Sequence, residues 1–196
     1  MAYLPATQRL VMFGGLGASN PSLGDTWLWD GHDWAQLWFT EPTPAGRSGA
    51  TLAYDGRRLI LFGGLHISTG PSPAGTYLND TWAFDGTHWQ QLRPASSPPA
   101  RSGAGVVQQG PNGVVIVGGS SETAQVGTYY NDMWRWDGSN WARLPVAMPG
   151  PANRYLFMTT QDSGRRVGLL FGGKAGGGAE LNDLWAWDGQ SWRALP

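Results

Sequence analysis

The sequence contains no cysteine, and its basic charge is almost entirely arginine, with Lys174 as the one lysine. Without cysteine there can be no disulfide, no thiolate ligand for a metal and no cysteine nucleophile. The formal net charge is only −1, so no strong field exists that would gather nucleic acid or an anionic membrane. We therefore expect neither nucleic acid nor a membrane as a partner.

Long apolar runs and export signals are also missing. No stretch approaches the roughly 18 apolar residues of a membrane-spanning helix. Residues 1–15 lack the basic start and apolar core of a signal peptide. As written, nothing exports or anchors this chain, so the cytoplasm is the expected compartment of the sequence, and the compartment of any longer parent protein stays open.

Histidine is scarce as well. His32, His66 and His88 are the three histidines, and no two of them show the His-x-x-x-His spacing of a helical metal site. We therefore expect no metal and no cofactor.

What the sequence does contain is a fourfold repeat. Each copy has a paired glycine at the end of an apolar run, an Asp-x-Trp step, an Asp-Gly turn and a further Trp. The runs read LVMFGG, LILFGG, VVIVGG and LLFGG, and the later elements read GDTWLWDG, NDTWAFDG, NDMWRWDG and NDLWAWDG. The first Trp of these later elements stands at Trp27, Trp82, Trp134 and Trp185. The period near 50 residues indicates tandem supersecondary units.

Each unit contains four short β-type runs joined by turns. In the second unit, Asp55-Gly56 joins the first two runs, a dipeptide favoured in tight hairpins. Asp80 precedes the third run, where we expect it to bond nearby backbone amides and hold the turn. The prediction is an all-β fold of four four-stranded antiparallel meanders in a single domain, 1–196. Its blades are expected at about 1–37, 47–92, 101–144 and 154–195.

The tryptophans indicate how the units pack. Each third strand places two aromatic residues on one face, and each fourth strand adds a Trp. A Trp buries roughly 150–250 Å², more in total than one small sheet can cover for itself. Stacking each sheet on the next buries the aromatic rows, and radial stacking produces a β-propeller.

Together, the double glycine, the Arg-Ser-Gly start of the first strand, the Asn-Asp-x-Trp step and the last Trp resemble kelch repeats, especially those of bacterial kelch proteins. The resemblance covers essentially the whole chain and implies a kelch-type propeller, related in fold to the central domain of galactose oxidase. Such propellers usually have six or seven blades, whereas four units are present here, without a spare strand for ring closure. Three interpretations stay open: a fragment of a longer protein, a closed four-bladed ring, or two chains that complete one ring. Bare blade faces at the ends would allow self-association.

Function is expected on the face that carries the unlike connections between second and third strands, because loops on a rigid scaffold carry recognition. The predicted ligand is a protein segment or a glycan, bound by Arg47, Arg101, Arg154, Tyr77, Glu122, Tyr129 and Lys174. The resemblance implies ligand contact for the three arginines, since arginines at this position contact acidic peptides in some kelch propellers. The alternative is that each Arg ties a loop carbonyl or a motif Asp to a neighbouring blade.

The predicted module is not an enzyme. Among kelch-type relatives, the copper radical oxidases need a Tyr-Cys crosslink, which a chain without cysteine cannot form. Two alternatives to a binding module stay open. One is a structural or assembly element without a ligand on the loop face, and the other is a sugar-modifying enzyme of the epimerase-like type.

Overall fold

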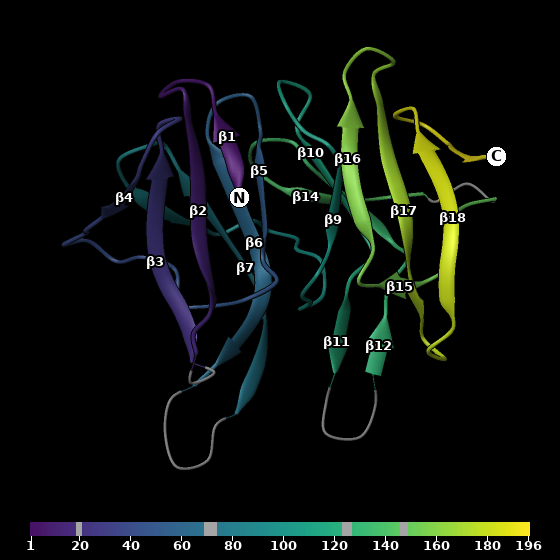
Figure 1. Cartoon of the computed structure of the whole chain (residues 1–196), viewed down its shortest axis with the longest axis horizontal. Coiled ribbons are helices and arrows are strands. Elements are labelled where there is room, and N and C mark those ends of the chain that lie inside the picture. The colour runs from purple at the N-terminus through teal and green to yellow at the C-terminus, as the bar shows by residue number, and fades with distance from the viewer. Residues whose placement is uncertain (19–20, 69–73, 123–126, 146–148) are drawn as a thin grey trace.

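The computed structural model describes residues 1–18, 21–68, 74–122, 127–145 and 149–196. Within these ranges the chain consists of strands, turns and bends, without a helical residue. The described part accordingly has no helix that could span a membrane. Four small antiparallel sheets are arranged as the blades of a four-bladed β-propeller (Figure 1), which confirms the predicted fold class.

The strands follow one another across each blade in chain order, and the first strands of neighbouring blades contact each other. Blade 1 contains β1 (Ala2–Leu4), β2 (Arg9–Leu16), β3 (Ser22–Trp29) and β4 (Trp34–Leu37). Blade 2 contains β5 (Thr51–Tyr54), β6 (Leu59–Ile67), β7 (Gly75–Phe84) and β8 (Trp89–Leu92).

Blades 3 and 4 depart slightly from the simple meander. Blade 3 contains β9 (Gly105–Gln108), β10 (Val114–Val117), β13 (Met133–Trp136) and β14 (Trp141–Leu144), with a separate hairpin of β11 (Ser120–Glu122) and β12 (Gly127–Tyr129). Blade 4 contains β15 (Arg154–Tyr155), β16 (Met158–Asp162), β17 (Val167–Ala175), β18 (Glu180–Trp187) and β19 (Trp192–Leu195). Both β15 and β16 pair with β17, because the first strand is interrupted near Leu156, whose φ is 55°.

The paired glycines mark the point where the second and third strands of a blade change register. In blade 2 the shift lies between Phe62 and Gly64, and Gly63 has a φ of 64°. A Cβ on Gly63 would lie 2.6 Å from the carbonyl oxygen of Arg101 in the next blade. The left-handed backbone and the close approach of two blades therefore both require glycine here.

The aspartate side chain of each Asp-Gly turn stabilises that turn. Asp55 Oδ1 accepts the backbone N–H groups of Arg57 and Arg58, each at 2.9 Å. The third-to-fourth-strand turns use the same arrangement at Asp30, Asp85, Asp137 and Asp188. These short turns lie at the edge of the blades opposite to the connections between second and third strands (Figure 1).

Three hydrophobic clusters join the four blades in sequence. Between blades 2 and 3, Trp141 packs on Phe62 with ring centroids 5.2 Å apart, and its indole N–H donates to Thr81 Oγ1 at 3.0 Å. Trp89 and Trp192 occupy the matching places at the first and third junctions. The predicted burial of aromatic rows between blades is therefore observed.

The outer faces of blades 1 and 4 are less covered. Trp34, which is equivalent in sequence to Trp141, is 40% exposed in blade 1. On blade 4, Met158 and Phe171 face each other across β16 and β17 and are 74% and 51% exposed. The described residues show no buried cluster that joins blade 4 to blade 1.

Candidate functional site

Arg47 and Arg101, shortly before the first strands of blades 2 and 3, and Arg154, at the start of blade 4, are each enclosed by their own blade. Arg101 donates from Nη1 and Nη2 to the two carboxylate oxygens of Asp132, at 2.5 and 3.0 Å. It also donates from Nη1 to the Gly118 carbonyl oxygen at 3.0 Å and from Nε to that of Pro99 at 3.0 Å. Arg47 with Asp80, and Arg154 with Asp183, repeat this set of contacts.

The three guanidinium groups lie inside the protein, since Arg47, Arg101 and Arg154 are only 1%, 1% and 2% exposed. These hydrogen bonds favour the alternative, structural role of the three arginines. Each side chain makes its contacts within its own blade. Contact of these arginines with a ligand stays an untested prediction.

The backbones of Arg47 and Arg101 join blades 2 and 3 to the blade before each. Arg101 N donates to the Leu78 carbonyl oxygen at 3.1 Å, and Gly64 N donates to the Arg101 carbonyl oxygen at 2.8 Å. Arg47 bridges Leu23 and Gly15 in the same way. One residue thus connects two blades, by its backbone to the preceding blade and by its side chain within its own.

The motif aspartates accept hydrogen bonds from these arginines and from the adjacent tryptophans. Asp132 Oδ2 accepts the indole N–H of Trp134 at 2.8 Å, and Asp80 does the same for Trp82. Their carboxylates accept from an indole and a guanidinium, and that of Asp80 also accepts its own backbone N–H. Burial alone would raise the pKa of Asp132, but the hydrogen bond and charge of Arg101 outweigh burial and lower that pKa.

The pair of Arg154 and Asp183 predicts a loss of stability in acid. The hydrogen bond from Arg154 lowers the pKa of Asp183 from 3.8 to about 2. Because the folded-state pKa is the lower one, the stabilisation is fully present above about pH 4 and is lost as the pH falls towards about 2. Urea unfolding of the wild type and Asp183→Asn should differ by about 1 kcal/mol at neutral pH, a value reduced for the partial exposure of the carboxylate. The difference should shrink below about pH 4, and a difference that stays constant down to about pH 2 would contradict the assignment.

We define the hairpin face as the surface formed by the described residues of the β6–β7, β11–β12 and β17–β18 hairpins. Figure 1 shows these hairpins along one edge of the molecule. Tyr77 on β7 lies close enough to Glu122 on β11 that burial and this carboxylate both raise the pKa of the tyrosine. The hairpins of blades 2 and 3 therefore bring together two of the predicted ligand-binding residues.

Tyr129 links the hairpin of blade 3 to blade 4. Its ring stacks on Tyr155 with centroids 4.9 Å apart and planes inclined by 31°. Tyr155 is the register partner of Lys174, and Lys174 Nζ lies 3.8 Å from Glu180 Oε1. The structure thus places Tyr77, Glu122, Tyr129 and Lys174 on the hairpin face, while the three arginines lie beneath it.

Two further aromatic residues belong to this region. Tyr130 stacks on the Arg101 guanidinium, with the guanidinium carbon 3.8 Å from the ring centroid. Tyr155 directly follows Arg154, and its position after a strand-starting arginine was the available signal. Both tyrosines connect the buried arginines to the hairpin face.

The histidines have separate surroundings in the structure. His66 Nδ1 lies 2.5 Å from the Gly46 carbonyl oxygen, whereas His32 and His88 sit in Asp-Gly turns on the opposite face. Among the described residues, no group of three or more His, Cys, Asp or Glu side chains is arranged to hold a metal ion.

Comparison with known proteins identifies relatives of most of the chain. The KLHDC2/KLHL20/DRC7 Kelch-repeats domain matches residues 1–166. The chain is 30% identical over 160 residues to the dynein alpha chain of the flagellar outer arm of Chlamydomonas reinhardtii, covering 78% of this chain and 3% of that protein. It is 27% identical over 201 residues to an F-box/kelch-repeat protein of Arabidopsis thaliana, covering 92% of this chain and 40% of that protein.

The chain therefore spans less than half the length of these relatives. Kelch-repeat domains are typical protein-interaction modules. The family match covers most of the chain, and the four blades carry the double glycine and the Asp-x-Trp step at equivalent places. The chain belongs to the Kelch-repeat family.

Proposed function

We infer that this chain is a non-catalytic binding module that recognises a protein segment on its hairpin face. The observation that carries this inference is the meeting of three unlike hairpins from blades 2, 3 and 4. They bring Tyr77, Glu122 and Tyr129 next to Tyr155 and Lys174. Tyrosines supply large contact area at a low cost in conformational entropy and are enriched in protein interfaces.

The charges of this face suit a segment with polar and apolar parts. Glu122 and Glu180 are exposed acids, and Lys174 offers a partly exposed ammonium group. Gly176 lets the backbone of the 174–181 turn pack closely on the Tyr129 ring, since a Cβ at this position would lie 2.8 Å from a ring carbon. A glycan could use the same aromatic rings, which makes it the alternative ligand.

The uses of the titratable groups support a non-catalytic role. Acid–base catalysis needs a pair of titratable groups held at a reacting atom. Here Asp80, Asp132 and Asp183 bind arginine and tryptophan side chains, and the aspartates of the Asp-Gly turns bind backbone N–H groups.

Replacing Tyr77 and Tyr129 together by alanine tests the proposal. We expect partners recovered from a lysate of the source organism to be depleted at least about thirtyfold, since the loss of even one interface anchor costs about 2 kcal/mol. The matched control is Trp38→Ala, because Trp38 is 82% exposed and lies outside the hairpin face. The measurement is quantitative mass spectrometry of captured proteins, with circular dichroism to confirm that both variants are folded.

Equal recovery by the wild type and the tyrosine variant would contradict the proposal. A glycan array run with the same three proteins tests the alternative, and glycan binding lost only in the tyrosine variant would replace the protein segment by a glycan. The remaining alternative is an assembly element that associates through the bare faces of blades 1 and 4, near Trp34 and Phe171. Light scattering that shows concentration-dependent association, without a partner on the hairpin face, would favour that role.

A further inference from the structure

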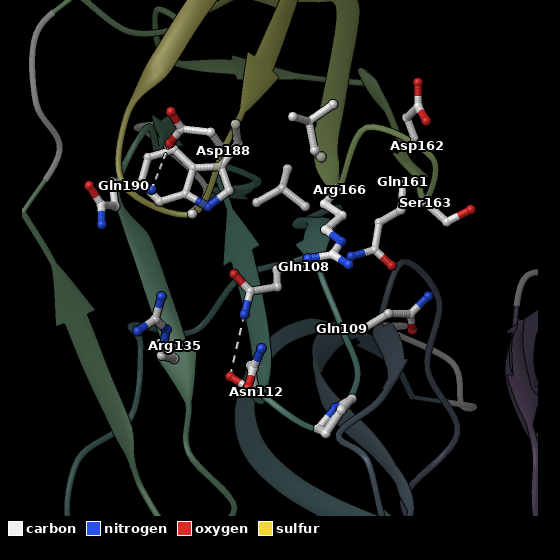
Figure 2. Close-up of a pocket in the computed structure, with 16 residues that line it drawn as sticks. Gln108, Gln109, Asn112, Arg135, Gln161, Asp162, Ser163, Arg166, Asp188 and Gln190 are labelled. Atoms are coloured by element: carbon white, nitrogen blue, oxygen red, sulfur yellow. Dashed lines mark hydrogen bonds between the residues drawn. The ribbon is translucent and has the colours of Figure 1, made fainter.

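A hollow between blades 3 and 4 opens on the face opposite to the hairpin face. It has a volume of about 780 Å³, within the range of small-molecule sites. Its walls come from the β9–β10 turn, the β16–β17 turn and the β18–β19 turn, together with Arg135 on β13 (Figure 2). These are the short turns of the propeller.

Two hydrogen-bond donors in the wall of this pocket are buried without a partner. They are Trp187 Nε1 and Arg135 Nε, and no acceptor meets either of them among the described residues. Trp187 is only 2% exposed. Both atoms are covered by the wall, so an acceptor must displace neighbouring atoms to reach them, and one that does so relieves a cost of about 1–3 kcal/mol per donor.

The junction between blades 2 and 3 shows which acceptor Trp187 lacks. Trp136 in blade 3 is equivalent to Trp187, and its indole N–H donates to Asp55 Oδ2 of blade 2 at 3.3 Å. Counted from the Arg-Ser-Gly starts, the residue of blade 3 that corresponds to Asp55 is Gln109. The Gln109 side chain turns to blade 2 instead, where its Oε1 accepts the backbone N–H of Tyr54 at 3.0 Å. Trp187 is therefore left without the carboxylate that its equivalent has.

Arg135 is a second departure from the repeat at the same junction. The equivalent residues of the third strands are Leu28, Ala83 and Ala186, all apolar. Only blade 3 has a charged side chain at this place, and that side chain lines the pocket. Two changes from the repeat, one that removes an acceptor and one that adds a cation, thus meet in one cavity.

Two arginines, Arg135 and Arg166, and two acids line the pocket. Arg166 extends into it from the β16–β17 turn (Figure 2), with an unusual φ of 57°. The two acids in the wall are already engaged. Asp162 binds Arg165 at 2.7 Å, and Asp188 accepts the backbone N–H groups of Gln190 and Ser191.

Carboxamide side chains complete the wall. Asn112, Gln161 and Gln190 line the pocket, and the hydrogen bonds found in the described part of the chain leave their side-chain amides unused. Each amide can both donate to and accept from a hydroxyl group.

We propose that this pocket binds a small hydroxylated carboxylate of the sugar-acid type. Arg135, Arg166 and the indole N–H of Trp187 donate to the carboxylate, and the carboxamides bind the hydroxyl groups. The site lies on the opposite face from the proposed protein-binding surface, so it would be a second binding site of the module. The junction between blades 2 and 3 also has a hollow, of about 630 Å³, but there Asp55 supplies the acceptor from within the protein.

Calorimetric titration of the full chain with D-glucuronate tests this site. Two comparison compounds separate the contributions of the carboxylate and the hydroxyl groups to binding. D-glucose has the hydroxyl groups without the carboxylate, and cyclohexanecarboxylate has the carboxylate without the hydroxyl groups. We expect D-glucuronate to bind at least about tenfold more tightly than either, because both kinds of contact are needed. Absence of D-glucuronate binding at millimolar concentration, or equal binding of either comparison compound, overturns the proposal.

Three variants locate the binding. Arg135→Leu, which installs the residue of blade 1, and Arg166→Gln should each weaken D-glucuronate binding about tenfold or more. Gln109→Asp places a carboxylate in the position of Asp55 and should compete with the ligand, so its affinity should fall while its melting temperature does not. The control is Arg93→Gln, since Arg93 is exposed and does not line the pocket. Binding that is unchanged in Arg166→Gln, or lost equally in Arg93→Gln, contradicts the site.

Discussion

Replacing Arg101 by alanine is expected to lower the free energy of unfolding by about 3–5 kcal/mol. The substitution leaves Asp132 as a carboxylate that is nine-tenths buried without its cation, and it removes the donors to Gly118 and Pro99. It also removes the stacking of the guanidinium on Tyr130. Urea unfolding followed by tryptophan fluorescence measures the effect.

The matched control for this substitution is Arg143→Ala, which removes the same charge from an exposed position on β14. That variant should change the free energy of unfolding by no more than about 0.5 kcal/mol. If Arg101→Ala were as stable as Arg143→Ala, the buried pair would not hold the blade, and a ligand-binding role for Arg101 would become the better explanation.

Replacing Trp141 by alanine should have an effect of similar size, about 3–5 kcal/mol. Trp141 is buried between blades 2 and 3, packs on Phe62 and Trp136, and donates to Thr81. Its removal leaves a cavity at the junction and an unused hydroxyl acceptor. Urea unfolding again measures the loss, which should appear as a lower midpoint with a similar slope.

Blade 1 provides the control for this second substitution. Trp34 occupies the equivalent position but is 40% exposed, because no blade covers it in the described structure. Trp34→Ala should therefore cost less than half as much as Trp141→Ala. Equal losses would mean that the tryptophans stabilise each sheet by itself and that stacking between blades contributes little.

Much of the fold could be predicted from the repeat because its residues have short-range reasons for their positions. Asp55-Gly56 predicts a turn, and the observed turn is closed by the Asp55 carboxylate. The alternation of Trp82 and Phe84 predicts a single aromatic face, and both side chains lie in the cluster between blades 1 and 2. The interruption near Leu156 was not predictable, since no glycine or proline marks it.

The role of the arginines could not be decided from the sequence. A strand-starting arginine can turn outward to a ligand or inward to a carboxylate, and Asp132 lies 31 residues after Arg101. The structure brings the two together because β10 pairs with β13, which places Asp132 beside Gly118. By contrast, the location of Tyr77, Glu122, Tyr129 and Lys174 on the hairpin face could be predicted from their place in unlike connections.

The pocket between blades 3 and 4 could not be predicted from the sequence alone. Its residues lie in short turns, where the sequence favoured a purely structural role. Comparing the repeats with one another identifies Arg135 and Gln109 as departures. That they meet at one junction, next to the unpartnered indole of Trp187, requires the arrangement of the blades.

The central claim is that the repeated residues hold the blades together, which leaves recognition to residues that differ between repeats. A double-mutant cycle of Arg101→Met and Asp132→Asn, measured by urea unfolding, tests it most directly. We predict that each single substitution costs about 3 kcal/mol or more and that the double variant costs less than the sum by at least about 1 kcal/mol. Losses that add to within about 0.5 kcal/mol, or single variants as stable as the wild type, would contradict the claim.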